Sequence, residues 1–229
     1  MQHKRTLAFI GAGNMSRSII AGLIQAGYPA GRIIAANPSR PKLDELADQF
    51  GIRITQNNAE AAREADVIVL AVKPQLMAAM LEALVAELGS LAGKLLISIA
   101  AGIKVERLQE MAGGHSRIIR TMPNTPSLLG LGMTGLYAPS GIEQADRDFA
   151  EQMMQAVGKT LWVAQESGIN GVIAAAGSAP AYFFLFMQGI AEEAEAMGFS
   201  PEQARLLVQQ TALGAAAMVE QNPALSLQA

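Results

Sequence analysis

Glycines and small residues form a spaced motif near the amino terminus of this 229-residue chain. The motif, Gly11-Ala12-Gly13-Asn14-Met15-Ser16, has the form G-x-G-x-x-(G/A), with Ser16 in the third small position. In dinucleotide-binding loops the first glycine permits a tight turn, the second lets the backbone approach a pyrophosphate, and the third small residue allows close helix–strand packing. Amides that open the following helix donate to the diphosphate. The same glycines also fit a bare structural turn, but their place between an apolar run and a helix favours dinucleotide binding.

The loop after the second apolar run bears on the choice between NADP and NAD. NAD sites place Asp or Glu here for the ribose 2′-hydroxyl, whereas this chain has Ala36-Asn37-Pro38-Ser39-Arg40 and no acid before Asp44. A carboxylate would repel a 2′-phosphate, while Ser39 can donate a hydrogen bond to it and Arg40 can form a charged fork. The pattern favours NADP and leaves NAD open. The alternative is an ordinary solvated loop with a surface arginine.

Two later segments follow apolar runs and are expected to face the same crevice, because the carboxyl ends of parallel strands meet there. Ala71-Val72-Lys73-Pro74 carries a lysine that is a candidate base, proton donor or ribose contact. A surface lysine fixed by Pro74 is the alternative. Ile99-Ala100-Ala101-Gly102 has only small side chains after Ile99, which leaves room for a nicotinamide ring.

Two proline-containing motifs are candidates for the substrate side of the site. Prolines on both sides of Asn124 and Thr125, in Met122-Pro123-Asn124-Thr125-Pro126, predict a rigid loop that holds these side chains toward the crevice. In Gly177-Ser178-Ala179-Pro180-Ala181-Tyr182 the proline frees a backbone carbonyl, and the small residues permit close approach of a ligand or another helix. A plain turn and a packing kink are the respective alternatives.

Histidine and cysteine usage limits the chemistry. The chain has no cysteine, which excludes disulfides, a thiol nucleophile and a cysteine metal site, and we predict no metal. Both histidines, His3 and His115, are expected to be solvated surface residues rather than crevice acids. No catalytic residue is therefore assigned from the sequence.

The elements that must position these loops alternate along the first two thirds of the chain. Apolar runs and amphipathic segments repeat as β-α units, which predicts an α/β Rossmann-like, doubly wound, mainly parallel sheet. The predicted strands span residues 6–10, 32–36, 65–71, 94–99, 117–120, 133–137 and 160–163, and the predicted helices span 18–26, 40–50, 77–88, 105–111 and 142–157.

Composition changes abruptly after residue 166. Of 17 Lys and Arg residues only Arg205 follows, and no charged residue occurs between Ser167 and Ala191. A membrane helix is one interpretation, but polar and helix-breaking residues inside the segment and the absence of a basic flank disfavour it. We expect an NADP-binding domain at 1–166 and an all-helical dimerisation domain at 167–229, buried against a second chain. The sequence Ser200-Pro201-Glu202-Gln203 predicts a capped helix start there.

Charge and termini exclude further classes. The net charge of −3 gives no basic face for nucleic acid. The amino terminus leads into only a short apolar run, which makes a poor signal peptide and favours a cytoplasmic protein without a membrane anchor.

Taken in order, the Gly11–Ser16 loop, the lysine-containing loop and the two proline motifs resemble those of pyrroline-5-carboxylate reductases, across the whole chain. The family pattern in the last motif is Gly-Ser-Gly-Pro-Ala-Tyr, so Ala179 is a departure. The resemblance implies reduction of 1-pyrroline-5-carboxylate to L-proline by hydride transfer from NADPH. Because a protonated imine is already electrophilic, the lack of a histidine–carboxylate pair fits imine reduction better than alcohol oxidation.

The resemblance also implies positions for the ligands. It implies a homodimer through the helical segment, with a larger assembly of dimers left open, and a Gly/Thr-rich substrate loop after Ala229. Alternatives are a related keto-acid reductase and a non-catalytic NADP-binding protein. The implied cofactor contacts are Ile10, Gly11, Ala12, Gly13, Asn14, Met15, Asn37, Ser39, Arg40, Asn58, Ala71, Val72, Lys73, Pro74, Ile99, Ala100 and Ala101, and the candidate substrate contacts are Asn124, Thr125, Ser178 and Ala179.

Overall fold

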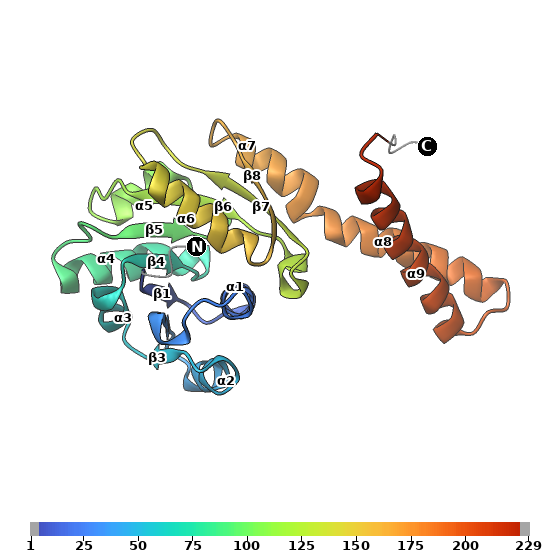
Figure 1. Cartoon of the computed structure of the whole chain (residues 1–229), viewed down its shortest axis with the longest axis horizontal. Coiled ribbons are helices and arrows are strands. Elements are labelled where there is room, and N and C mark those ends of the chain that lie inside the picture. The colour runs from blue at the N-terminus through green and yellow to red at the C-terminus, as the bar shows by residue number, and fades with distance from the viewer. Residues whose placement is uncertain (1–4, 225–229) are drawn as a thin grey trace. The chain divides into compact units, whose positions relative to one another are not determined.

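A computed structural model describes residues 5–224 (Figure 1). The strands are β1 (Leu7–Ile10), β2 (Ile33–Ala36), β3 (Arg53–Thr55), β4 (Val67–Leu70), β5 (Leu95–Ser98), β6 (Ile118–Met122), β7 (Gly132–Tyr137) and β8 (Gly158–Trp162). The helices are α1 (Asn14–Gln25), α2 (Arg40–Phe50), α3 (Asn58–Glu64), α4 (Met77–Leu88), α5 (Val105–Met111), α6 (Gln144–Gln155), α7 (Gly168–Val172), α8 (Ala179–Ala196) and α9 (Pro201–Gln221).

Within the described residues, eight strands form one sheet in the order β3-β2-β1-β4-β5-β6-β7-β8. All neighbours from β3 to β6 are parallel, β7 runs antiparallel to β6, and β8 is parallel to β7. The first six positions have the strand order of a dinucleotide-binding fold. The predicted α/β, mainly parallel architecture is confirmed.

One β-α unit was absent from the predicted elements. β3 is a three-residue edge strand, and its Arg53 is exposed. The helix that follows, α3, buries only alanines against the sheet. Neither element has the apolar run or periodicity from which strands and helices are read in a sequence, so the prediction that passed over them was incomplete.

Helices cover both faces of the sheet and enclose two apolar cores (Figure 1). The first core lies under α1, α2 and α6 and includes Ile19, Leu43 and Phe149. The second lies under α3, α4 and α5 and includes Ala61, Leu81 and Leu108. Burial on both faces explains why the central strands are apolar at consecutive positions, since a one-sided sheet would alternate.

The chain divides into two compact units between Gly177 and Ser178. The first unit includes α7, because Ile169 is fully buried and Val172 fills the space where Gly135 has no side chain: a Cβ there would lie 2.7 Å from a Val172 methyl carbon. A π turn, Ile173–Gly177, follows α7. Our expected boundary at residue 166 therefore lies upstream of the point where the compact units separate.

The second unit contains α8 and α9, which contact each other. Its expected helix start is confirmed: Ser200 Oγ accepts from the Gln203 amide and Gln203 Oε1 accepts from the Ser200 amide. Large apolar side chains on α8 remain exposed, Phe183 by 67% and Phe186 by 70%. Among the described residues one helical stretch, Gly168–Ala196, is long and apolar enough to cross a membrane by length and composition alone.

Candidate active site

The loops predicted to form the site follow the carboxyl ends of the central strands. Ile10, Leu70, Ser98 and Arg120 are level with one another in the strand register. The chain leaves β1 for α1 on one face and leaves β4 for α4 on the other. Adjacent strands whose connections diverge in this way create a crevice, the usual ligand position in open α/β sheets.

Gly11 begins the loop after β1 and has φ +110°, a conformation that side-chain-bearing residues rarely adopt. Its amide donates to Ala36 O at 2.8 Å, which ties the loop to β2. A Cβ at this position would lie 2.5 Å from Ala71 O at the end of β4. Ser16 Oγ donates to Gly11 O at 2.6 Å, so the third small residue also satisfies a buried carbonyl. The structure therefore requires Gly11 for its own packing.

Gly13 differs from Gly11 because its geometry does not require glycine. Its φ of −84° is ordinary, and a Cβ would meet no atom of the described residues 5–224 within 4 Å. It precedes α1 without any side-chain cap, and the first turn of α1 has no acidic residue. Uncapped amides at a helix start bind anions. An open cradle over such amides fits the diphosphate of a dinucleotide.

The β2–α2 loop is joined to the glycine loop by Asn37. Its Oδ1 accepts from the Ala12 amide at 3.3 Å, and its Nδ2 donates to Ser39 O at 3.2 Å. Ser39 precedes α2 without a side-chain capping bond. Arg40 is 60% exposed, and its Nε donates to Asp44 Oδ1 at 2.7 Å. Asp44, the first acidic residue after the loop, therefore forms an ion pair with Arg40.

A residue that sequence reasoning missed supports this loop from β3. Gln56 Nε2 donates to Pro38 O at 2.8 Å. Asn57 Oδ1 accepts from the amides of Ala59 and Glu60 and so caps α3, while Asn58 is the first helical residue and is partly buried. Asn57 is a typical helix-capping residue and could have indicated the start of α3 from the sequence. The signal was not used because neither β3 nor α3 was predicted.

The loops after β4 and β5 reach the same edge. The Ala71 amide donates to Ile10 O at 2.9 Å, which holds this loop beside the glycine loop. Lys73 is exposed where a short turn, Pro74–Leu76, begins. After β5, Ala100 is buried while Ala101 is exposed, and the Ala100 amide donates to Ser98 Oγ at 3.3 Å. Small side chains therefore follow β5 at this edge, and room for a nicotinamide ring there stays a prediction.

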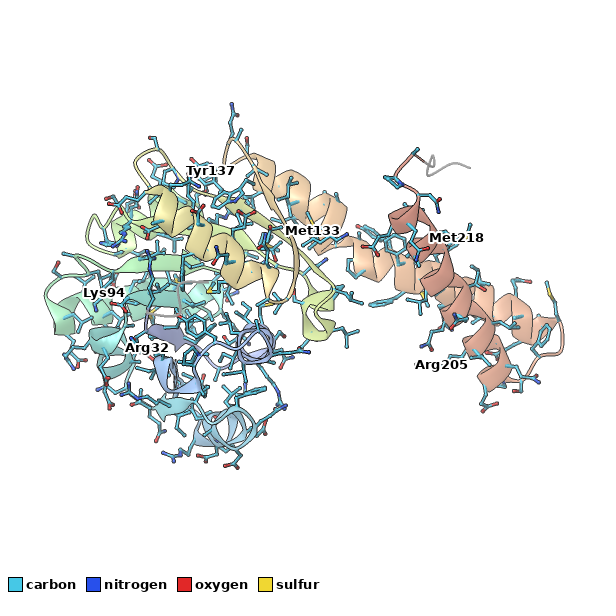
Figure 2. The ribbon with its side chains drawn as sticks, viewed as in Figure 1. Arg32, Lys94, Met133, Tyr137, Arg205 and Met218 are labelled. Atoms are coloured by element: carbon cyan, nitrogen blue, oxygen red, sulfur yellow. The ribbon has the colours of Figure 1, made fainter. Side chains whose placement is uncertain are left out.

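Of the four candidate substrate residues, Asn124 makes two internal hydrogen bonds. Its Nδ2 donates to Ala176 O in the π turn at 3.1 Å, and its Oδ1 accepts from the Met133 amide of β7 at 2.8 Å. Met133 is labelled in Figure 2. Thr125 is exposed at the start of a short turn, Thr125–Leu129. Ser178 and Ala179 begin the second compact unit.

A partly buried ion pair between Arg120 and Glu166, which the sequence did not predict, stabilises this edge. Arg120 Nη1 donates to Glu166 Oε1 at 2.9 Å, and the Val105 amide at the start of α5 donates to the same oxygen at 2.8 Å. Arg120 is 4% exposed, and within residues 5–224 its Nε has no hydrogen-bond partner. The pair joins β6, α5 and the segment that leads into α7.

The opposite edge of the sheet holds a separate polar cluster. Asp146 is fully buried on α6 and accepts from Arg5 and Arg117. Burial raises the pKa of Asp146, but hydrogen bonds from Arg117 and Arg5 outweigh it and lower the pKa below 3.8. This cluster precedes β1 and β6, so it stabilises the fold far from the crevice.

One histidine expectation is corrected at this edge. His115 is half-buried rather than solvated, and its Nε2 lies 3.0 Å from Lys94 O (Lys94 is labelled in Figure 2). Burial lowers the pKa of His115 below 6.5, although hydrogen bonds with the Lys94 and Arg117 backbone oppose the shift. His3 lies outside the described residues. Among residues 5–224, no group of three or more histidines and acids could hold a metal ion.

Comparison with known proteins agrees with this geometry. Residues 6–102 match the family described as "NADP oxidoreductase coenzyme F420-dependent", and residues 166–228 match "Pyrroline-5-carboxylate reductase dimerisation". A pyrroline-5-carboxylate reductase of Vibrio alginolyticus is 57% identical over 99% of this chain and 82% of its own length. One from Haemophilus influenzae is 46% identical over the same shares.

Solved structures show the same likeness. A pyrroline-5-carboxylate reductase of Coxiella burnetii has a TM-score of 0.90 at 42% identity, over 95% of this chain and 80% of its own. The Plasmodium falciparum pyrroline carboxylate reductase, solved with NADP bound, has a TM-score of 0.83 at 28% identity, over 96% and 80%.

The sheet order, the crevice and the glycine cradle define a dinucleotide-dependent oxidoreductase of the Rossmann type. The described part of its second unit, residues 178–224, falls within the region matched by a dimerisation family. The chain belongs to the pyrroline-5-carboxylate reductase family.

Proposed function

We propose that this chain reduces 1-pyrroline-5-carboxylate to L-proline with NADPH as the hydride donor. The observation that carries the proposal is the open cradle at Gly13 over the uncapped start of α1, in a chain 57% identical to a reductase of that name. NADP is the cofactor of a related solved structure, and NAD remains the alternative for this chain.

The cofactor residues divide by the part of the dinucleotide that they meet. Around the 2′-phosphate, Ser39 and Arg40 supply a hydroxyl and a charged fork. The exposure of Arg40 supports this assignment, because its side chain is accessible to a ligand and only its Nε donates to Asp44. The diphosphate is assigned to Ile10, Gly11, Ala12, Gly13, Asn14 and Met15, the adenosine side to Asn37, Ser39, Arg40 and Asn58, and the nicotinamide side to Ala71, Val72, Lys73, Pro74, Ile99, Ala100 and Ala101.

The chemistry requires positioning more than acid–base catalysis. The bound cofactor supplies a hydride to the imine carbon. A protonated ring nitrogen already makes that carbon electrophilic, so holding the two reactants in line accounts for most of the rate gain. Exposed Lys73 is the ionisable side chain on the β4 loop, and Thr125, Ser178 and Ala179 are the proposed substrate contacts.

A direct assay separates this function from its alternatives. The enzyme is mixed with NADPH and the pyrroline, and the loss of NADPH absorbance is followed. Rapid oxidation with the pyrroline, and little with ketopantoate or a 3-oxo acid, is the expected result. Oxidation with the keto acids instead would identify a keto-acid reductase. Tight NADPH binding without turnover on any substrate would identify a non-catalytic binding protein.

We also propose a cytoplasmic homodimer that can form a larger assembly of dimers. Support comes from the dimerisation family matched by residues 166–228 and from the exposed aromatic residues of α8. Glutamates close the apolar stretch at Glu192 and Glu193, where a membrane helix would place basic residues. A dimer that sediments without detergent is expected, and a requirement for detergent would contradict the proposal.

A further inference from the structure

The side-chain amide of Asn124 joins three segments that are distant in the sequence. It extends from the loop after β6, donates from Nδ2 to Ala176 O at 3.1 Å and accepts at Oδ1 from the Met133 amide at 2.8 Å. The two bonded partners belong to the π turn and to β7. One N–H of its Nδ2 and one lone pair of its Oδ1 are thus engaged within the protein, which gives Asn124 a part in holding these segments together.

The carbonyl of Ala176 lacks its usual donor for a reason visible in the sequence. In an α-helix each carbonyl accepts from the amide four residues later. Four residues after Ala176 stands Pro180, which has no amide hydrogen. The next amide, that of Ala181, donates to Ser178 O at 3.1 Å. Ala176 is partly buried, and a carbonyl withdrawn from water without a donor is costly, so Asn124 supplies the donor from outside the helix.

The same loop is held to the π turn by packing. Met122 Cε would lie 3.6 Å from a Cβ at Gly177, so the last residue of β6 closes on the end of the turn. Met122 at the end of β6 and Asn124 in the loop after it thus both approach the π turn. Thr125, the next residue after Asn124, is exposed. Thr125 therefore lies directly beside the residue that links this loop to the π turn and to β7.

We propose that Asn124 is a positioning residue, which replaces the missing Pro180 amide at the Ala176 carbonyl and thereby fixes Thr125 on the substrate side of the site. The inference rests on the proposed reductase function, because only that function provides a substrate for Thr125 to contact. Asn124 acts through the loop and the π turn and touches neither substrate nor cofactor.

The isosteric variant Asn124→Asp tests the donor alone. It keeps an oxygen for the Met133 amide but places a second oxygen against the Ala176 carbonyl. Misplaced reacting groups cost up to about 100-fold in rate, so we expect kcat/KM for the pyrroline to fall between about 10-fold and 100-fold. The Kd for NADPH should remain within about 2-fold of wild type, because the loop lies outside the proposed cofactor contacts. Unchanged pyrroline kinetics would overturn the proposal.

Ser127→Ala is the matched control in the same turn. Within the described residues Ser127 Oγ is buried without a hydrogen-bond partner, so its removal breaks no bond. Wild-type kinetics are expected. A loss in Ser127→Ala equal to that of Asn124→Asp would show general sensitivity of the turn and would overturn a specific role for the Asn124 amide.

Pro180→Ala supplies the decisive second variant. It restores an amide four residues after Ala176, which can donate in place of Asn124. The double variant Asn124→Asp/Pro180→Ala should therefore recover at least about 5-fold of the lost kcat/KM, a non-additivity expected of partners that serve one carbonyl. Strictly additive losses would contradict the proposal.

A readout without turnover separates this inference from the proposed function. Amide hydrogen exchange at Met133 should be protected in wild type and in Asn124→Asp, and should accelerate at least about 10-fold in Asn124→Ala, which loses the acceptor. Equal exchange in all three proteins would refute the contact. If wild type fails to oxidise NADPH with the pyrroline, the reductase function fails, while the exchange result still decides whether Asn124 holds β7.

Discussion

Gly11 and Gly13 lie two residues apart in one loop, yet they serve different purposes. Gly11 combines φ +110° with a Cβ position 2.5 Å from Ala71 O, so the protein's own backbone requires glycine there. Gly13 has ordinary dihedrals and open space around its Cβ position. The motif therefore contains one glycine needed for folding and one whose absent side chain leaves space for a ligand.

Alanine substitution at each glycine distinguishes these purposes. Gly13→Ala should leave the melting temperature unchanged and raise the Kd for NADPH at least about 10-fold, which is about 1.4 kcal/mol. Gly11→Ala should destabilise the protein by about 2 kcal/mol or more, because it adds strain and a backbone clash. Thermal unfolding and NADPH titration measure both. Equal NADPH affinity in wild type and Gly13→Ala would contradict a diphosphate at this loop.

Arg40 is expected to set the preference for NADPH over NADH. Loss of a charged, exposed contact to a 2′-phosphate in Arg40→Gln should raise KM for NADPH about 10-fold and leave KM for NADH unchanged. The control Asp44→Asn releases the arginine from its present partner and should lower KM for NADPH by less than about 5-fold. Steady-state kinetics with both cofactors provide the measurement, and a parallel rise in both KM values would count against the assignment.

At the scale of elements, Asp146 of α6 connects the segments that precede β1 and β6. Arg5 Nη1 and Arg117 Nη2 each lie 2.8 Å from Asp146 Oδ1, and the carboxylate is fully buried. Arg5 also stacks over the ring of Phe149, 4.8 Å from its centroid. The cluster thus links α6 to the segments that lead into β1 and β6.

The lowered pKa of Asp146 predicts an acid-sensitive fold. Because this pKa lies below the unfolded value of about 3.9, the ionised carboxylate stabilises the native state above about pH 4, and the contribution disappears as pH falls through the folded pKa. Asp146→Asn should cost about 3 kcal/mol at neutral pH and flatten the acid limb of the stability curve. Urea unfolding at several pH values measures both. Asp44→Asn, in an exposed pair, should cost less than about 1 kcal/mol.

Element prediction succeeded where packing and local pattern agree. The central strands are apolar because both faces are buried, and each of β1, β2, β4 and β5 lies within its predicted range. The short β3 and the alanine-rich α3 escaped because their burial is slight or made by small side chains. His115 was placed wrongly because its carbonyl partner, Lys94, comes from the distant segment that precedes β5.

At the scale of the whole molecule, the helical unit exposes a continuous run of large apolar side chains. Residues 182–186 of α8 are all large and apolar, and each is at least 65% exposed. Contiguous patches of this kind mark interaction sites. The family matched by residues 166–228 accounts for them as a dimerisation surface.

A charge in this patch should prevent association. Phe184→Asp is expected to shift the protein from dimer to monomer or aggregate in sedimentation velocity, because a buried carboxylate without a partner is strongly unfavourable. Glu82→Gln, on the exposed side of α4, is the control and should sediment as wild type. A wild-type chain that is a stable, soluble monomer would contradict the dimer.

What the sequence determines by itself is local: the glycine spacing, the consecutive apolar strands, the missing amide of Pro180 and the capping pair of Ser200 and Gln203. Each depends on residues a few positions apart, whose backbone geometry follows from their own chemistry. Only the tertiary structure decided that β7 runs antiparallel and that Glu166 neutralises Arg120. It also decided that Asn124 serves the carbonyl that Pro180 leaves free, across 52 residues. Such contacts join residues with no fixed spacing, and they form only when the sheet brings distant segments to one edge.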